Sequence, residues 1–462
     1  MTVRADIAIV GAGPGGYVAA LRAAQLGAKV VVIEKDRIGG VCLNWGCIPT
    51  KTLLRSAEVL MLAREAANYG VQANDVRLDW LAAQKRKDAV VRRLTGGVKL
   101  LLDRAKVQLM SGTARFVSPM TLEVTEGNAV EQVEAAKYVL ATGSRPAALP
   151  IPGLDSPDVL TSDGVLALET LPGSMLVIGA GPIGVEFATL FSACGVQVTL
   201  VEVLPRVLPT LDADLGAEVE RALKKAKVKV YTNSKVTRME SHNGKRAVTV
   251  VTDVGEMAVE VDKVLMAVGR RPNVEELSLT AAGVAVEKTG IKVDAHMQTN
   301  VPHIYAVGDV VGGILLAHVA MHEGVIAVEN ALGHERIMNY AAVPSCVFTW
   351  PEVASVGLSE EQARARGYDV RIGKFPFRAN GKALAQGEHD GLVKIVAESK
   401  YGQILGVHIA GPHASDLIQE GTLALTLEAT LDEIGMTIHP HPTLSEAIAE
   451  AALAAQSRAL HF

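Results

Sequence analysis

Hydrophobic and polar positions near the start of the chain follow a strand, turn, helix and strand pattern. Residues 7–10 form a short apolar run, and a glycine-rich turn follows it. The next segment is rich in Ala and Leu at helical spacing and ends near Gly27, before a second apolar run that ends at Glu34. This pattern predicts a βαβ unit with an acid at the tip of its second strand.

The same pattern occurs again at residues 175–201, at a constant offset. The matched pairs are Gly11 with Gly179, Gly13 with Gly181, Gly16 with Gly184, Gly27 with Gly195 and Glu34 with Glu202. In such a unit the first glycine permits the tight turn and the second admits a pyrophosphate. The third lets helix pack on strand, and the acid accepts hydrogen bonds from ribose hydroxyls. Because strand, turn, helix and acid agree in both copies, we expect two dinucleotide sites rather than two turns without ligands.

The tip of the second unit distinguishes the two nicotinamide dinucleotides. Glu202 is followed by Val203, with a single basic residue nearby at Arg206. A carboxylate binds a ribose 2′-hydroxyl and repels a 2′-phosphate. The sequence therefore favours NAD over NADP at this site.

Composition narrows the class of protein. The chain has 462 residues, of which 49% are hydrophobic, and a formal net charge of −5. This is too apolar for a disordered chain, lacks a membrane-spanning run, and offers no basic surface for nucleic acid or anionic membranes. We expect a soluble protein of about three domains. No targeting pattern precedes the first strand, so we expect a reducing cytoplasm.

Cys42 and Cys47 lie in the segment Gly39–Lys51. In an ideal helix their Cα atoms would be about 8.6 Å apart, beyond the ~7 Å that a disulfide bridges. A bond between them needs a distorted turn, which Gly46 and Pro49 can supply. Strain of that kind suits a redox pair. Two inert thiols and half of a metal site are the alternatives, but no further Cys or His ligands follow at short spacing, so we predict no metal.

Another cluster, HPHPTLSE, begins at His439. A His held by a carboxylate is a suitable base for a thiol, and Glu446 is placed to reach His441. By sequence alone, a Pro-rich loop with a surface His is an equal alternative.

Elsewhere, Cys194 and Cys346 are expected in the core, and His318 and His322 in packing or surface roles.

The motifs GAGPGG, GGVCLNWGCIPTK, ATGSRP, GAGPIGVEFA and HPHPTLSEA resemble those of the FAD-dependent pyridine nucleotide–disulfide oxidoreductases over nearly the whole chain. The resemblance implies an α/β fold with two Rossmann-like domains and a C-terminal α+β dimerisation domain. The expected divisions are an FAD-binding domain at 1–148 and 270–342, an NAD-binding domain at 149–269, and an interface domain at 343–462.

The resemblance also implies roles for individual residues. The FAD contacts would be Gly11, Gly13, Gly16, Glu34, Lys51, Ala114, Gly143, Asp309 and Ala317. The NAD contacts would be Gly179, Gly181, Gly184, Glu202, Val236, Ala267, Gly269 and Arg270. Cys42 would exchange with substrate and Cys47 would lie against the flavin, with Lys51 paired to Glu186. His441 with Glu446 would act across a homodimer interface.

Within that family the chain is most similar to the branch that oxidises protein-bound dihydrolipoyl groups with NAD⁺. The expected partner is the lipoyl-bearing acyltransferase (E2) of a 2-oxoacid dehydrogenase complex. Two alternatives stay open at this point: an NAD(P)H-dependent reductase of another disulfide, similar to glutathione reductase, and a redox-sensing subunit that binds dinucleotides without turnover.

Overall fold

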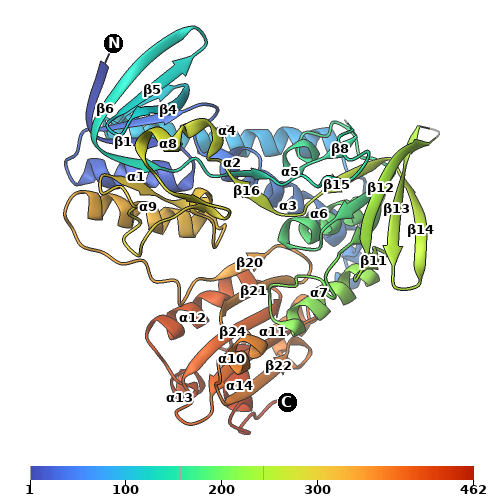
Figure 1. The fold of residues 1–462 in the computed structure, drawn as a ribbon. Coiled ribbons are helices and arrows are strands. Elements are labelled where there is room, and N and C mark those ends of the chain that lie inside the picture. Colours follow the sequence, from blue (N-terminus) through green and yellow to red (C-terminus); the bar gives the residue numbers. More distant parts are fainter. Residues whose placement is uncertain (1, 157, 243) are drawn as a thin grey trace.

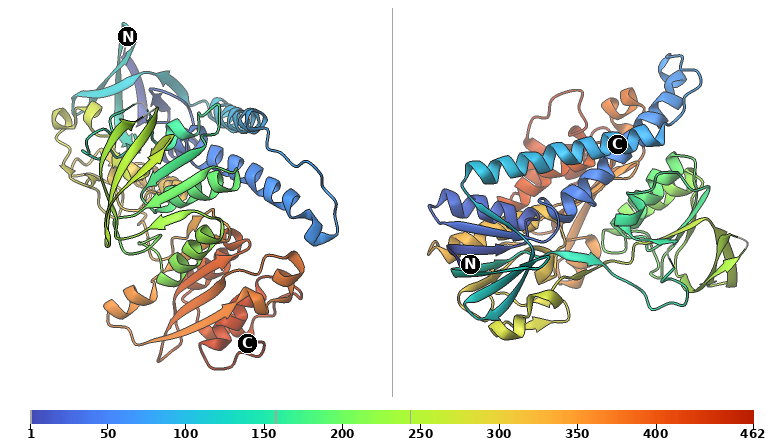
Figure 2. Two further views of the ribbon diagram at one scale, coloured as in Figure 1. Left: turned by 90° about the vertical axis from the view of Figure 1, so that its right-hand side faces the viewer. Right: turned by 90° about the horizontal axis from the view of Figure 1, so that it is seen from above.

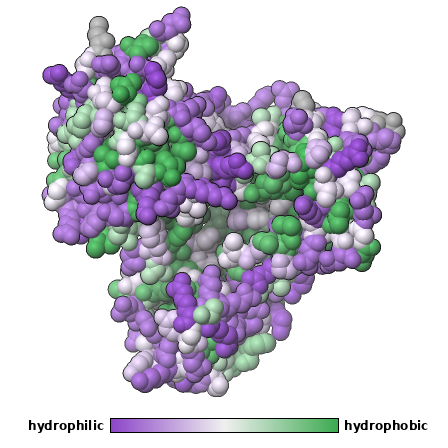
Figure 3. All heavy atoms as spheres, viewed as in Figure 1, coloured by the Kyte–Doolittle hydropathy of each residue, from purple (hydrophilic) through white to green (hydrophobic). Residues whose placement is uncertain are grey.

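The computed structural model describes residues 2–156, 158–242 and 244–462, which form three lobes (Figure 1). The first lobe contains the start of the chain and a later segment, drawn in blue, cyan and gold. The second, in green, comes between these two parts in sequence. The third, in orange and red, is the C-terminal part. Figure 3 shows that the face between the three lobes is hollowed.

A seven-stranded sheet forms the centre of the first lobe. Its order is β3-β2-β1-β6-β5-β4, and β19 pairs with β6. β1 is parallel to β2 and β6, with Ile7 opposite Val30 and Lys137, whereas β4, β5 and the first half of β6 form an antiparallel extension. The strands are β1 (Thr2–Val10), β2 (Val30–Glu34), β3 (Gln108–Ser111), β4 (Thr113–Ser118), β5 (Thr121–Glu126), β6 (Ala129–Leu140) and β19 (Ile304–Ala306).

Helices from both parts of the first lobe cover this sheet. α1 packs closely on α9, because Gly15 leaves room for the Ala320 carbonyl, 3.1 Å from where a Cβ would stand. α4 is the long helix crossing the lobe in Figure 2. The helical elements are α1 (Pro14–Gln25), α2 (Gly40–Asn44), α3 (Cys47–Arg64), η1 (Ala66–Tyr69), α4 (Trp80–Arg104), η2 (Glu275–Leu277), α8 (Leu279–Ala282), η3 (Gly308–Val311) and α9 (Ala317–Ala331). A small hairpin, β17 (Val286–Glu287) and β18 (Gly290–Ile291), completes the lobe.

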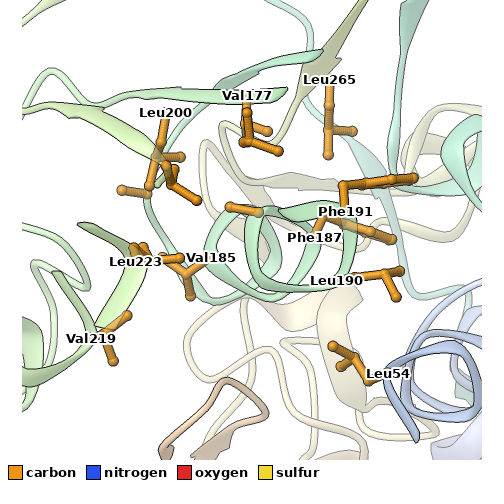
Figure 4. Packing of buried hydrophobic residues seen from close by; sticks show 14 of the residues in the cluster. Leu54, Val177, Val185, Phe187, Leu190, Phe191, Leu200, Val219, Leu223 and Leu265 are labelled. Carbon is orange, nitrogen blue, oxygen red and sulfur yellow. The ribbon is translucent and has the colours of Figure 1, made fainter. Parts of the chain in front are cut away.

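The second lobe has a parallel sheet in the order β11-β10-β9-β15-β8 and a separate antiparallel sheet in the order β12-β13-β14. Its elements are β8 (Val159–Leu160), α5 (Ser162–Val165), β9 (Ser174–Ile178), α6 (Pro182–Ala193), β10 (Gln197–Val201), α7 (Ala213–Lys225), β11 (Lys229–Tyr231), β12 (Lys235–His242), β13 (Lys245–Thr252), β14 (Gly255–Val261) and β15 (Lys263–Met266). Figure 4 shows α6 at the centre of a hydrophobic cluster, with Leu54 of α3 packed against it. The helix that begins at Cys47 is therefore anchored to the second lobe.

The chain crosses between these two lobes along a two-stranded ribbon of β7 (Ser144–Pro146) and β16 (Arg270–Pro272). The strands are antiparallel, and Arg270 lies opposite Pro146. The expected divisions at 148/149 and 269/270 lie beside this ribbon.

The third lobe has an antiparallel sheet in the order β20-β21-β24-β23-β22, with helices packed on it. Its elements are β20 (Ser345–Val347), β21 (Glu352–Gly357), α10 (Glu360–Ala365), β22 (Val370–Pro376), η4 (Phe377–Ala379), α11 (Gly381–Gln386), β23 (Leu392–Glu398), β24 (Ile404–Gly411), α12 (Ala414–Thr426), α13 (Leu431–Met436) and α14 (Glu446–Ala454). The expected fold class, two α/β nucleotide units with a C-terminal α+β domain, is confirmed. None of the helices in the described part of the chain is both long and apolar enough to cross a membrane.

Candidate active site

The two glycine-rich turns have nearly the same backbone conformation. Gly11 has φ +103° and Gly179 has φ +102°, in the left-handed region that favours glycine. A Cβ on Gly16 would overlap with the carbonyl oxygen of Gly11, and one on Gly184 with that of Gly179. Each turn therefore needs glycine for its shape and for helix packing.

The surroundings of the two turns differ. The first turn touches the cysteine segment, because a Cβ on Gly40 would stand 2.8 Å from the Cα of Gly13. The matched second turn is open: a Cβ on Gly181 meets no atom within 4 Å. Both turns lead into helices that begin with proline, at Pro14 and Pro182, where the first-turn N–H groups have no intrahelical partner. Each helix start thus presents amides suited to a pyrophosphate.

The tip acids also support the turns themselves. Glu34 accepts hydrogen bonds from the amides of Ala12 (2.7 Å) and Asp36 (2.9 Å). Glu202 accepts from Ala180 (2.6 Å) and Leu204 (2.9 Å). This structural role was not foreseen from the sequence. It leaves lone pairs on both carboxylates, each of which can accept up to about four hydrogen bonds.

Cys42 and Cys47 lie on different helices on either side of a backbone break. α2 ends at Asn44, Trp45 and Gly46 are non-helical, and Cys47 begins α3. A Cβ on Gly46 would stand 2.9 Å from the Val41 carbonyl oxygen, so glycine is what lets the turn close. The expected distortion occurs at Gly46. Pro49 instead lies in the first turn of α3, where proline is tolerated.

The two thiols interact and are unequal. Both are free in this structure, with Cys42 half-buried and Cys47 exposed. The hydrogen bond from the Cys42 thiol, assisted by the charge of Lys51, lowers the pKa of Cys47 to about 7, although the surrounding atoms partly desolvate its sulfur and act in the opposite direction. The same hydrogen bond, together with burial, raises the pKa of Cys42. Of the two thiols, Cys47 is therefore the one that ionises near neutral pH, and Cys42 keeps its proton.

Lys51 and Glu186 form the expected ion pair beside the thiols. Lys51 Nζ lies 2.9 and 2.8 Å from the two carboxylate oxygens. Glu186 is buried on α6 and also accepts the Phe348 amide at 3.0 Å, while the Lys51 ammonium lies 4.6 Å from the centre of the Phe348 ring. Side chains from all three lobes thus fix the cation that stabilises the Cys47 thiolate.

Asp309 lies near the interlobe ribbon and receives a hydrogen bond from the Ser144 hydroxyl. Arg270 donates to the Ser144 hydroxyl (2.7 Å) and carbonyl (2.8 Å). Arg270 was predicted to bind NAD, and the structure places its guanidinium at this junction, 3.9 Å from Asp309. Glu323, which no motif in the sequence marks, accepts a hydrogen bond from the Gly308 amide at 2.6 Å, and burial raises its pKa.

His441 is held by Glu446 as expected. His441 Nδ1 lies 2.8 Å from one carboxylate oxygen, and the Thr443 amide donates to the other at 2.8 Å. Burial opposes ionisation, but these two hydrogen bonds lower the pKa of Glu446. The His441 side chain is 78% exposed and lies in the third lobe, whereas Cys42 lies in the first.

The other predicted contact residues are distributed over the first two lobes. Gly143 accepts the Asn273 amide, Ala317 begins α9, and Ala114 is buried in β4. In the second lobe Val236 is buried in β12, Gly269 has φ +105°, and Ala267 lies against Gly179, where a Cβ would stand 2.5 Å from its carbonyl oxygen.

Four residues predicted to have no role in the site can also be placed. Cys194 and Cys346 are half-buried at the edges of two hydrophobic clusters, and burial raises the pKa of each to about 11. His318 and His322 are exposed, and His318 contacts the Pro344 carbonyl oxygen.

Comparison with known proteins gives the class. Residues 5–324 match the pyridine nucleotide-disulphide oxidoreductase family, and residues 343–452 match the dimerisation domain of that family. The chain belongs to this family, whose cofactors are FAD and NAD.

Curated relatives narrow the assignment. The chain is 46% identical to a dihydrolipoyl dehydrogenase of Bacillus subtilis, with 100% of both chains covered. It is 45% identical to a dihydrolipoyl dehydrogenase of Thermus scotoductus, covering 99% of this chain and 98% of the relative. A solved structure, LpdA from Mycobacterium tuberculosis, superimposes with a TM-score of 0.89 at 30% identity, covering 97% of this chain and 99% of LpdA. Within the family the chain groups with the dihydrolipoyl dehydrogenases, which are oxidoreductases.

Proposed function

We propose that this chain oxidises dihydrolipoyl groups carried by the acyltransferase (E2) of a 2-oxoacid dehydrogenase complex and reduces NAD⁺, as the E3 component. The observation that carries the proposal is a pair of unequal thiols, Cys42 and Cys47, fixed beside the Lys51–Glu186 ion pair. The relatives' printed name agrees with this chemistry.

The proton step belongs to His441. A dithiol substrate must lose a proton before its sulfur can attack a disulfide. The imidazole of His441 can accept this proton at Nε2, which has no hydrogen-bond partner among the described residues, while Nδ1 bonds to Glu446. The carboxylate then stabilises the imidazolium that forms.

The sulfur steps follow from the unequal thiols. In the oxidised pair, the substrate thiolate attacks the Cys42 sulfur, a mixed disulfide forms, and Cys47 leaves as the thiolate of lower pKa. The second substrate sulfur then attacks the first as its proton passes to the departing Cys42 sulfur, which closes the lipoyl disulfide and returns Cys42 as a thiol. Two electrons have passed from the substrate to the Cys42–Cys47 pair.

FAD would be held by the first turn and NAD by the second. Three features of both turns fit a dinucleotide. Their glycines allow close approach of the backbone, their helices begin with unpaired amides, and their carboxylates have spare lone pairs. The proposed FAD contacts are Gly11, Gly13, Gly16, Glu34, Lys51, Ala114, Gly143, Asp309 and Ala317. The proposed NAD contacts are Gly179, Gly181, Gly184, Glu202, Val236, Ala267, Gly269 and Arg270. When bound, FAD would supply the two-electron redox chemistry that links the dithiol to NAD⁺.

The proposed assembly is a homodimer in the cytoplasm. The matched dimerisation domain supports the dimer, and the exposure of His441 suits a base that serves the partner's thiols. The proposed domains are 1–148 with 270–342 for FAD, 149–269 for NAD and 343–462 for the interface. A chain of this length with only 4 Cys lacks the disulfide framework of small secreted proteins, which suits a reducing compartment.

Replacing the thiolate tests the electron path. Cys47→Ser should abolish NAD⁺ reduction by dihydrolipoamide, because Ser can neither form the disulfide nor leave as a thiolate. The measurement is NADH formation in the purified flavoprotein, with Cys194→Ser as the matched control. Near wild-type turnover by Cys47→Ser would rule out this mechanism.

Replacing the base tests the proton step. His441→Ala should reduce dihydrolipoamide turnover by about 10² or more. Oxidation of NADH by ferricyanide should stay near wild type, because that route needs no proton transfer from a substrate thiol. His389→Ala, at an exposed loop position, is the control. An unchanged dihydrolipoamide rate would leave His441 as a loop residue.

Substrate competition separates the proposal from another disulfide reductase. We expect a preference for NADH over NADPH. The Glu202 carboxylate would repel a 2′-phosphate, and the next two residues, the exposed Val203 and Leu204, carry no positive charge to bind it. We also expect lipoamide to be reduced far faster than glutathione disulfide. The reverse preferences would contradict the proposal.

A further inference from the structure

The loop that carries His441 joins α13 to α14 and has few backbone hydrogen bonds available to it. Pro440 and Pro442 flank His441, and neither has an N–H to donate. Side chains therefore have to fix the loop. On its C-terminal side, Asn380 donates to the Thr443 carbonyl at 2.9 Å.

The anchor on the N-terminal side is His439. Its ring bridges two elements: Nδ1 lies 2.8 Å from the Thr437 carbonyl oxygen, at the end of α13, and Nε2 lies 2.9 Å from the Glu420 carboxylate on α12. The side chain of His439 is 7% exposed, compared with 78% for His441 two residues later. The buried imidazole is thus fixed by contacts at both ring nitrogens, two residues before the exposed imidazole of His441.

The contacts of His439 define its charge. A carbonyl oxygen and a carboxylate are both acceptors, so both ring nitrogens must donate, and only the imidazolium carries two N–H groups. The hydrogen bond with Glu420 raises the pKa of His439, and the charge of Glu446 on α14 acts in the same direction. On α13, Glu433 is engaged by Thr430 and Asp432 by Gln456.

We propose that His439, held as an imidazolium between Glu420 and the Thr437 carbonyl, is the positioning residue for the His441 base. The inference rests on the proposed function, since it assigns His439 to the same proton step. His439 touches no reacting atom in this scheme; it fixes the loop that presents His441.

Dihydrolipoamide turnover depends on pH through the second N–H of His439. Because the pKa of His439 is raised, its second N–H is present below that pKa and is lost as pH rises through it. His439 then loses one of its two hydrogen bonds to Thr437 and Glu420, the loop is held less firmly, and dihydrolipoamide turnover declines on the alkaline side. Without the Glu420 charge the pKa falls, so the decline should begin at lower pH.

The test uses the purified full-length flavoprotein and the variants Glu420→Gln and His439→Gln. Wild type is first confirmed to reduce NAD⁺ with dihydrolipoamide. Glu420→Gln should lower kcat/KM for dihydrolipoamide about 10-fold, because small displacements of a catalytic group cost up to ~10²-fold. It should also move the alkaline limb to lower pH and leave NADH–ferricyanide activity within about twofold. Glu256→Gln, on an exposed hairpin of the second lobe, should change none of these.

A double variant tests whether the two side chains act as one unit. Glu420→Gln with His439→Gln should lose no more than the larger single effect, because coupled residues are not additive. If Glu420→Gln does not retain flavin, Glu420→Asp replaces it and should give a smaller loss with the alkaline limb in place.

The outcomes separate the two proposals. A wild-type protein inactive with dihydrolipoamide contradicts the proposed function. An active wild type in which Glu420→Gln keeps its rate and pH profile overturns the inference alone. Equal losses of dihydrolipoamide and ferricyanide activity also overturn it, because His439 would then hold the fold and not the base.

Discussion

The two βαβ units differ in what lies against their turns, not in the turns themselves. Gly11 and Gly179 agree within one degree in φ, yet the first turn is in contact with Gly40 and the second is open at Gly181. Position 15 is Gly where α9 packs, and the matched position in the second unit is Ile183. One backbone motif thus serves two purposes. The closed turn suits a resident cofactor tied to the thiols, and the open turn suits one that exchanges.

The largest expected effects come from the third glycine of each unit. Gly16→Ala and Gly184→Ala each force a methyl against a carbonyl oxygen, at a cost of roughly 1–3 kcal/mol or more. Gly16→Ala should lose flavin absorbance. Gly184→Ala should keep it, and dihydrolipoamide should still bleach the flavin, but NADH should not form. Loss of flavin from Gly184→Ala would contradict the division between the turns.

A smaller effect is expected from the contact that makes the turns unequal. Gly40→Ala places a methyl 2.8 Å from Gly13 in a left-handed backbone, at about 1–2 kcal/mol, so flavin should be retained about 10-fold less tightly. Its counterpart Gly181→Ala should leave flavin affinity and thermal stability unchanged and raise KM for NAD⁺. The measurement is flavin release from each variant as the guanidinium concentration is raised. If Gly40→Ala and Gly181→Ala release flavin at the same concentration, the two turns do not differ in the way described.

The smallest effect concerns the thiols beside the closed turn. Lys51→Met removes a charge that lowers the pKa of Cys47, so the pKa should rise from about 7 and less thiolate should be present at neutral pH. The pH dependence of iodoacetamide alkylation of the reduced protein measures this. The control Lys85→Met, at an exposed position on α4, should leave the midpoint of alkylation unchanged. An unchanged midpoint for Lys51→Met would contradict the prediction and would mean that the Cys42 hydrogen bond alone sets the pKa of Cys47.

Three features could be predicted because the residues that form each of them are close together in the sequence. They are each glycine-rich turn, the thiol pair and the His441–Glu446 contact. The Gly46 break was expected because a regular helix cannot bring Cys42 and Cys47 together. Glu323 could not be predicted, because its partner Gly308 is 15 positions away and one buried carboxylate has no pattern. The same holds for the Arg270 contact with Ser144, which arises when distant strands meet.

The hydrogen bond between Glu420 and His439 could not be predicted for a similar reason. Sequence places both prolines beside His441, but α12 must fold against the loop before Glu420 is within reach.

The ribbon of β7 and β16 bears on how such a chain arises by gene duplication. Its strands put the entry and exit of the second lobe side by side. A duplicated unit whose two ends are neighbours can be spliced into one surface loop of its host without disturbing the host sheet, since closing a long loop adds little entropic cost. The duplication visible in the glycines is thus compatible with insertion as a single event, after which each copy diverged around an unchanged turn.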